Sequence, residues 1–312
     1  MQKLDFIADV LNPILDEDPL AVLVPVDGQA LAMSDRLTQV MVSNTLIGGA
    51  DFMPTDSPKT VAARLLRICV AELAAKGAVA RNCSLVLCLN ETANNNWINM
   101  FGVGLVNELQ EFGLSIVSSE TKTTKGPVVV SMSCVGELAG KPLSAKGARP
   151  GDLICQSGQA GLAALGQHIQ AGADFGFKDH QNDRFVGAHL SPEPNWALGS
   201  FLLDQARARA AVNISTGLLP DLVRLALTSD VGINIDFSSI SFADNSLPIG
   251  QQIFESPDHQ LLFSVPAETV EHVRKWFPQV SVIGRVLPGQ GVRLLDATGA
   301  EISFDRLAAD RF

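Results

Sequence analysis

The sequence predicts an α+β protein made of two domains. Segments with apolar residues at helical spacing alternate with short, continuously apolar segments typical of buried strands, and this alternation occurs in both halves of the chain. With 312 residues and 46% hydrophobic content, the chain is long enough to bury two cores. The pattern is interrupted near Lys141, so we expect one domain over residues 1–141 and a second over residues 142–312.

In the first half, Gly77 and Gly113 end two predicted helices, because glycine is the favoured residue just after a helix. Asparagines before the second helix supply side-chain oxygens that can cap it. The apolar segments around these helices predict strands. In chain order we expect strands over 20–26 and 39–46, a helix over 58–76, a strand over 79–89, a helix over 94–112, and strands over 114–117 and 128–138.

The second half repeats this alternation. Residues 171–191 are rich in Gly, Asp, Asn and His and lack periodicity, which predicts a long loop or lid. The remaining elements expected are a strand over 153–156, helices over 161–170, 194–210 and 217–229, and strands over 211–214, 233–237, 260–265, 280–286 and 292–295.

Composition excludes several classes of function. No apolar run approaches the roughly 20 residues that span a bilayer, and the N-terminus lacks the pattern of a secretory signal. The five cysteines form no C-x-x-C pair, which argues against a zinc site and suits a reducing compartment, where they are expected in the core. A net charge of −10 without a Lys/Arg cluster argues against nucleic-acid binding. We expect a cytoplasmic protein with no membrane or nucleic-acid partner.

The most distinctive segment is SAKGARPGDLICQSGQAGLAAL at residues 144–165. Pro150 and Gly151 form a turn, Asp152 can bond the backbone of that turn, and the following apolar residues begin a strand. The segment resembles the start of the second domain in thiamine-monophosphate kinases. Other segments resemble motifs of that family in the same order along the chain, at residues 17–23, 43–52, 71–78, 118–123, 194–199, 214–222 and 256–261.

Aspartates of these motifs are only partly kept. The family's Gly-Asp-Asp is matched by Glu17-Asp18-Pro19, so one aspartate remains. Its Thr-Asp-Thr-Leu-Val-Glu-Gly-Val-His-Phe is matched by residues 43–52, where Asn44 replaces the aspartate and Asp51 the histidine. Its Ser-Asp-Leu-Ala-Ala is matched at Glu72. Its Gly-Gly-Asp-Thr-Thr-Arg is paired with residues 118–123, which puts Glu120 at the position of the aspartate. Its Ile-Ser-Asp-Gly-Leu-x-x-Asp-Leu is matched by residues 214–222, where Thr216 replaces the first aspartate and Asp221 keeps the second.

The resemblance implies the superfamily that includes aminoimidazole ribonucleotide synthetase and selenophosphate synthetase. It implies a homodimer formed through the sheet of the N-terminal domain, with ATP and Mg²⁺ at the dimer cleft and a small phosphorylated metabolite as substrate. By position, the resemblance makes Asp18, Glu72 and Glu120 the metal ligands, and Asp18 and Glu120 also the catalytic residues. The ATP-binding residues that it implies are Asn44, Thr45, Thr121, Thr216 and Asp221. The substrate-binding residues that it implies are Asp51, Asp258 and His259.

Each of these residues also has a purely structural interpretation. Asp18 and Asp221 can cap turns or helices, Glu72 can pair with Lys76 along a helix, and His259 can pack in a strand. Neutral residues at Asn44 and Thr216 weaken the attraction for a divalent cation. Two hypotheses follow: an ATP- and Mg²⁺-dependent phosphotransferase or ligase with an altered substrate, in which Asp18, Glu72 and Glu120 converge, or a pseudoenzyme that keeps the fold as a dimeric binding module without such a cluster.

Overall fold

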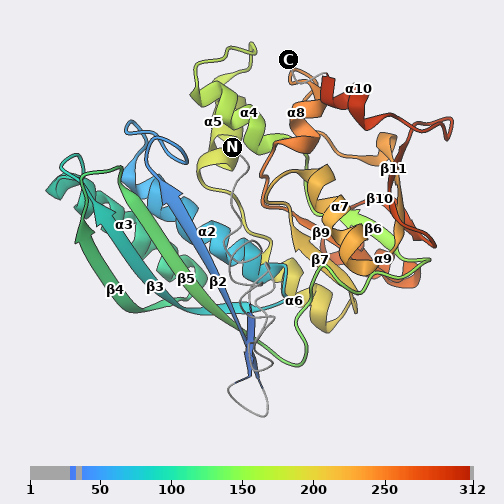
Figure 1. Cartoon of the computed structure of the whole chain (residues 1–312), viewed down its shortest axis with the longest axis horizontal. Helices are drawn as coiled ribbons and strands as arrows, with labels where there is room; N and C mark the ends of the chain where they lie inside the picture. The colour runs from blue at the N-terminus through green and yellow to red at the C-terminus, as the bar shows by residue number, and fades with distance from the viewer. Residues whose placement is uncertain (1–28, 33–36, 310–312) are drawn as a thin grey trace, which may run out of the picture.

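The computed structural model describes residues 29–32 and 37–309 and shows two α+β halves joined by a close contact (Figure 1). Within these residues the first half forms a sheet with strand order β1-β2-β5-β3-β4. Its elements are β1 (Gln29–Ala32), β2 (Thr38–Ile47), α2 (Pro58–Ala74), β3 (Val79–Leu89), α3 (Asn95–Phe112), β4 (Ser115–Thr123) and β5 (Val129–Leu138).

Helices α2 and α3 cover one face of this sheet (Figure 1). Helix α2 begins with Pro58 in its first turn, and most of its side chains are buried. Helix α3 begins as predicted, because Asn94 Oδ1 accepts the Trp97 N–H at 3.0 Å, and it ends at Gly113, whose φ is 65°. The two helices approach closely at Gly104, where a Cβ would lie 2.6 Å from Lys59 Cα.

The opposite face of this sheet carries no helix in the described structure (Figure 1). Thr45 and Ser131 join β2 and β5 there through hydroxyl groups 2.7 Å apart. Apolar side chains between 39% and 41% exposed lie on the same face, on strands β2 and β3: Met41, Ile47 and Val86. We refer to this surface as the open sheet face.

The second half is built on a six-stranded sheet with strand order β11-β8-β10-β6-β9-β7. One apolar cluster on it contains residues of α7 and α8, and the cluster on its other face contains residues of α6, α9 and the end of α2. The elements are β6 (Leu153–Gln156), α4 (Leu162–Gln170), α5 (Asp179–Leu190), α6 (Trp196–Asp204), β7 (Ala210–Asn213), α7 (Leu218–Ser229), β8 (Gly232–Asp236), α8 (Ile249–Phe254), β9 (Leu261–Val265), α9 (Val270–Trp276), β10 (Ser281–Leu287), β11 (Gly291–Leu295) and α10 (Phe304–Ala309).

The lid predicted over residues 171–191 is wrong, because this stretch contains helix α5. Helix α5 packs against α4 so closely that a Cβ on Gly166 would lie 2.0 Å from Phe185 O. Phe185 is 2% exposed, and its ring packs at a tilt against the ring of Phe177, which in turn packs against the ring of Phe175. The helix is therefore stabilised by tertiary packing, which its polar sequence does not reveal.

Two other predicted elements also differ from the structure. Strand β4 continues to Thr123 because it pairs in parallel with β3, and the helix predicted over 194–210 ends at Asp204 because Ala210 already belongs to β7. Helices α8, α9 and α10 were not predicted. The strand predicted over 20–26 lies outside the described residues. The predicted domain boundary at Lys141 falls between β5 of the first sheet and β6 of the second.

Four of the five cysteines are buried, as expected for core residues. Cys83 and Cys134 face each other on β3 and β5, and their contact together with burial raises the pKa of the Cys83 thiol far above its ordinary value. Among the described helices, none has the length and apolar character needed to cross a membrane.

Candidate functional site

Asn44 and Glu72 lie together on the helix-covered side of the first sheet. Asn44 Nδ2 donates to Glu72 Oε1 at 3.4 Å, although β2 and α2 place the two residues 28 positions apart. Both residues stand at positions where the motifs of the family named above have aspartates. The pair supplies one carboxylate and one amide oxygen, and therefore one negative charge where two aspartates would supply two.

Glu120 lies elsewhere. It is opposite Val86 in the parallel ladder, which places it on the open sheet face, and its carboxylate pairs with Lys122 at 2.8 Å. Strand β4 is three strand spacings from β2, or about 14 Å. Glu72 and Glu120 therefore cannot hold one ion within a single chain. Thr121 lies on the other face of β4, opposite Leu87.

A complete magnesium site is not formed by the described part of one chain. Asp18 lies outside the described residues. Within residues 29–32 and 37–309, no three His, Cys, Asp or Glu side chains are grouped as a metal site requires. Mg²⁺ prefers six oxygen ligands in near-octahedral geometry, so the Asn44–Glu72 pair alone does not fit it.

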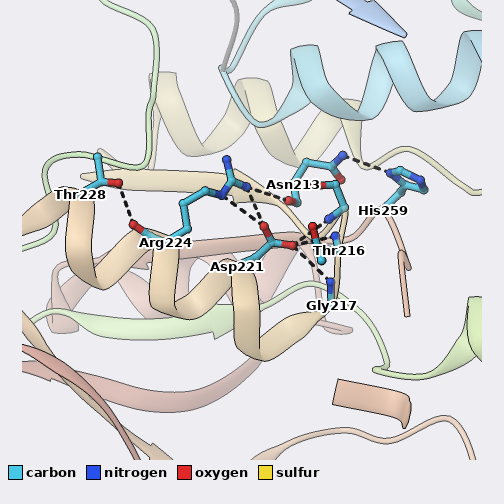
Figure 2. Close-up of polar contacts among 8 residues, drawn as sticks. Asn213, Thr216, Gly217, Asp221, Arg224, Thr228 and His259 are labelled. Carbon is cyan, nitrogen blue, oxygen red and sulfur yellow. Dashed lines mark hydrogen bonds and ion pairs between the residues drawn. The ribbon is translucent and has the colours of Figure 1, made fainter. Parts of the chain in front are cut away.

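Asp221 organises the loop that joins β7 to α7. Its Oδ2 accepts the N–H groups of Ser215 and Thr216 at 2.9 and 3.1 Å, and its Oδ1 accepts Arg224 Nη2 at 2.8 Å (Figure 2). The carboxylate is thus used inside the protein, as the capping interpretation predicts, while Thr216 is exposed at the tip of the loop. A direct contact of Asp221 with ATP remains a prediction that this geometry does not favour.

Asp258 caps helix α4. Its two carboxylate oxygens accept the N–H groups of Gly161 and Ala163 at 2.9 and 2.8 Å, and Ser256 Oγ donates to it at 2.7 Å. Burial raises the pKa of Asp258 to about 6 even though these hydrogen bonds act in the opposite direction. The side chain is 4% exposed, so its predicted contact with substrate would require it to leave the cap.

His259 is buried at the junction of the two halves beside Asn213 (Figure 2). Burial is the main cause that lowers the pKa of His259 to about 3, with a further contribution from Arg64, so the imidazole is neutral. A neutral ring can accept, and Asn213 Nδ2 lies 3.1 Å from its Nδ1. The residue has a φ of 51°, in the left-handed region that non-glycine residues adopt uncommonly, although Asn, Asp and His are enriched there.

Arg64 of α2 is a residue at this junction that sequence reasoning missed. Its Nη1 donates to the carbonyl oxygen of Asp51 in the loop between β2 and α2. Its charge lowers the pKa of both His259 and His189 of α5, where His189 falls to about 4 mainly because of burial. The sequence did offer one sign of Arg64, since it lies between the apolar residues Ala63 and Leu65 of an apolar helix, where a charged residue is uncommon.

Comparison with known proteins identifies the family. The model for the N-terminal domain of AIR synthase related proteins matches residues 21–138, and the model for the C-terminal domain matches residues 149–297. The chain belongs to the AIR synthase related protein family. It is 30% identical to the thiamine-monophosphate kinase of Escherichia coli O157:H7 over 253 residues, which cover 77% of this chain and 75% of that protein.

Solved structures of thiamine-monophosphate kinases share the fold. One described as AaThiL complexed with AMPPCP and TMP has a TM-score of 0.81 and 22% identity, and the match covers 94% of both chains. The kinase from Stenotrophomonas maltophilia K279a has a TM-score of 0.75 at 25% identity, covering 94% of this chain and 96% of that one. The predicted superfamily and the two-domain α+β fold are thereby confirmed.

Proposed function

We propose that this protein is a cytoplasmic, ATP-binding phosphotransferase of the thiamine-monophosphate kinase type that acts on a different small phosphorylated metabolite. The Asn44–Glu72 contact supports the proposal most directly, because it keeps two motif positions of the family within 3.4 Å of each other. The complex of a related fold with AMPPCP, an ATP analogue, and TMP supports a nucleotide and a phosphorylated molecule as ligands.

Its phosphoryl transfer is expected to be slow. Such transfer depends on positioning and on neutralising the charge of the transferred group, and here Asn44 and Thr216 bring no charge. Asp51 stands where the family motif has a histidine, so the loop between β2 and α2 presents a different side chain to a substrate than the corresponding loop of a thiamine-monophosphate kinase. We therefore expect a related metabolite to be the better substrate.

We also propose that the active form is a homodimer in which the open sheet faces of two copies pack together. Met41, Ile47 and Val86 leave apolar surface exposed there, and burying it against a second copy is favourable.

A second candidate function is a pseudoenzyme that binds a nucleotide or metabolite as a dimer without turnover. The position of Glu120 favours it, since this carboxylate pairs with Lys122 on the opposite side of the sheet from Glu72.

Formation of ADP from ATP, measured with thiamine phosphate and a panel of phosphorylated metabolites, separates these functions. We expect one metabolite to support turnover, and Glu72→Gln to reduce that turnover by about tenfold or more while leaving the fold intact. Glu111→Gln on the exposed surface of α3 is the matched control and should change nothing. Ligand binding without ADP formation from any member of the panel would instead support the pseudoenzyme.

A further inference from the structure

We propose that Arg64, His189 and His259 form an oxyanion-binding site at the junction of the two halves, which receives a phosphate or carboxylate group of the metabolite. This inference rests on the proposed function in assigning the junction to the substrate. It goes further by naming the residues that recognise the anion, none of which lies in the depleted magnesium motifs.

The site is assembled from three distant segments. Helix α2 supplies Arg64, the C-terminal turn of α5 supplies His189, and the segment just before β9 supplies His259. Helix α2 packs against both α5 and β7, which brings these segments to one place. Convergence of a guanidinium and two imidazoles from both domains is the arrangement by which a ligand is held between domains.

Arg64 has donors that the protein leaves unused. Its one hydrogen bond in the described structure is to the carbonyl oxygen of Asp51, and no carboxylate there lies within ion-pair distance of its guanidinium. A guanidinium carries five N–H donors in a planar fork that matches the oxygens of phosphate and carboxylate. The remaining donors are therefore available to a ligand.

Two buried atoms at the junction independently indicate a missing partner. His189 Nδ1 and Asn213 Oδ1 have no hydrogen-bond partner among the residues that the structure describes. Asn213 is 5% exposed, and its amide nitrogen already contacts His259. Buried polar atoms are almost always satisfied, so a bound group with both oxygens and a hydroxyl, such as hydrogen phosphate, fits these positions.

Two carboxylates near Arg64 oppose an anion, but each already accepts hydrogen bonds from other groups. Asp51 Oδ2 accepts the Ile47 N–H at 2.8 Å, and Asp56 accepts the Met53 N–H at 2.8 Å and Gln170 Nε2. The pKa of Arg64 is lowered overall, because burial outweighs the attraction of both carboxylates. The two carboxylates therefore do not fully offset the cost of burying the Arg64 charge, which favours binding of a further negative charge.

The test uses the full-length protein, ¹⁵N-labelled at histidine, with inorganic phosphate and acetate as separate probes and no nucleotide present. We expect phosphate to shift the ring signals of His189 and His259 and to leave those of the exposed His272 unchanged. A response to phosphate alone identifies a phosphate site, and a response to acetate as well identifies a general oxyanion site. If neither probe moves the two signals, the proposal is overturned whether or not any variant folds.

A matched pair of variants assigns the binding to Arg64. Arg64→Met should weaken phosphate binding at least about tenfold, since hydrogen bonds to charged groups are lost. Arg81→Met removes an exposed arginine from β3 of the same domain and should leave the affinity unchanged. Equal affinity in wild type and Arg64→Met would exclude Arg64 as the anion ligand. Phosphate binding without any ADP formation would contradict the proposed phosphotransferase while retaining this site.

Discussion

The buried histidine at the domain junction should make stability depend on pH in a way that one substitution removes. His259 has a pKa of about 3 in the folded protein and 6.5 as its ordinary value, so between these limits the unfolded chain binds the extra proton. Its contribution is fully present above pH 6.5 and is lost as the pH falls. The linkage relation gives a loss of about 2 kcal/mol between pH 7 and pH 5, and this loss hardly changes if the folded pKa is one unit higher.

His259→Asn tests this directly, because Asn tolerates the φ of 51° but does not titrate. Urea unfolding at pH 7 and pH 5 should show that the variant loses about 2 kcal/mol less stability than wild type over this interval. The pKa of neighbouring Asp258 is raised to about 6, so its carboxylate binds a proton in the folded protein first and increases the stability as the pH falls. Asp258 is present in both proteins, so its contribution cancels in the comparison. The exposed His180→Asn is the control and should keep the wild-type profile. An unchanged pH dependence in His259→Asn would refute the argument from burial.

Three further predictions concern assembly, packing and chemistry. Val86→Arg on the open sheet face should convert a dimer into a monomer in sedimentation velocity, whereas Leu227→Arg, an exposed position on α7, should not; a wild-type monomer would contradict the proposed interface. Gly199→Ala should lower the free energy of unfolding by about 1–3 kcal/mol, because its Cβ would lie 2.2 Å from Ala74 O where α6 packs on α2. The control Gly187→Ala on α5 places its Cβ where nothing lies within 4 Å and should be neutral or stabilising. Equal melting temperatures of the two variants would contradict this packing. Glu120→Gln should abolish turnover without unfolding the protein if the motif assignment of Glu120 is right, and unaltered kinetics would remove it from the site.

Local signals explain which elements could be predicted from the sequence. Helix α3 was predicted within one residue because Asn94 and Gly113 mark its ends through their own backbone chemistry. Helix α5 could not be predicted, since its one buried side chain is Phe185 and its stability comes from contact with α4. The C-terminal part of β4 was missed because every residue of this edge strand is exposed, so burial leaves no pattern to recognise.

Candidate site residues were proposed from the sequence only where a family motif contains them. Asn44 and Glu72 were each singled out by a matched family position, although their contact was not predicted, whereas Arg64, His189 and Asn213 belong to no such motif and were not singled out. The segment containing Glu120 can also be paired with its motif in a second way. Thr123-Thr124-Lys125 resembles the ending Thr-Thr-Arg, and that pairing would place Lys122 at the aspartate position and remove the carboxylate.

Calorimetric titration of the full-length protein with ATP, with and without Mg²⁺, tests the proposed function most directly. The proposal predicts measurable but weak binding, with a Kd in the micromolar to millimolar range that Mg²⁺ changes only a few-fold, because Asn44 and Thr216 supply no charge for the ion. Submicromolar affinity that disappears when a chelator is added would show that the chain retains a strong magnesium site. No binding of ATP under either condition would contradict the assignment as a nucleotide-dependent phosphotransferase.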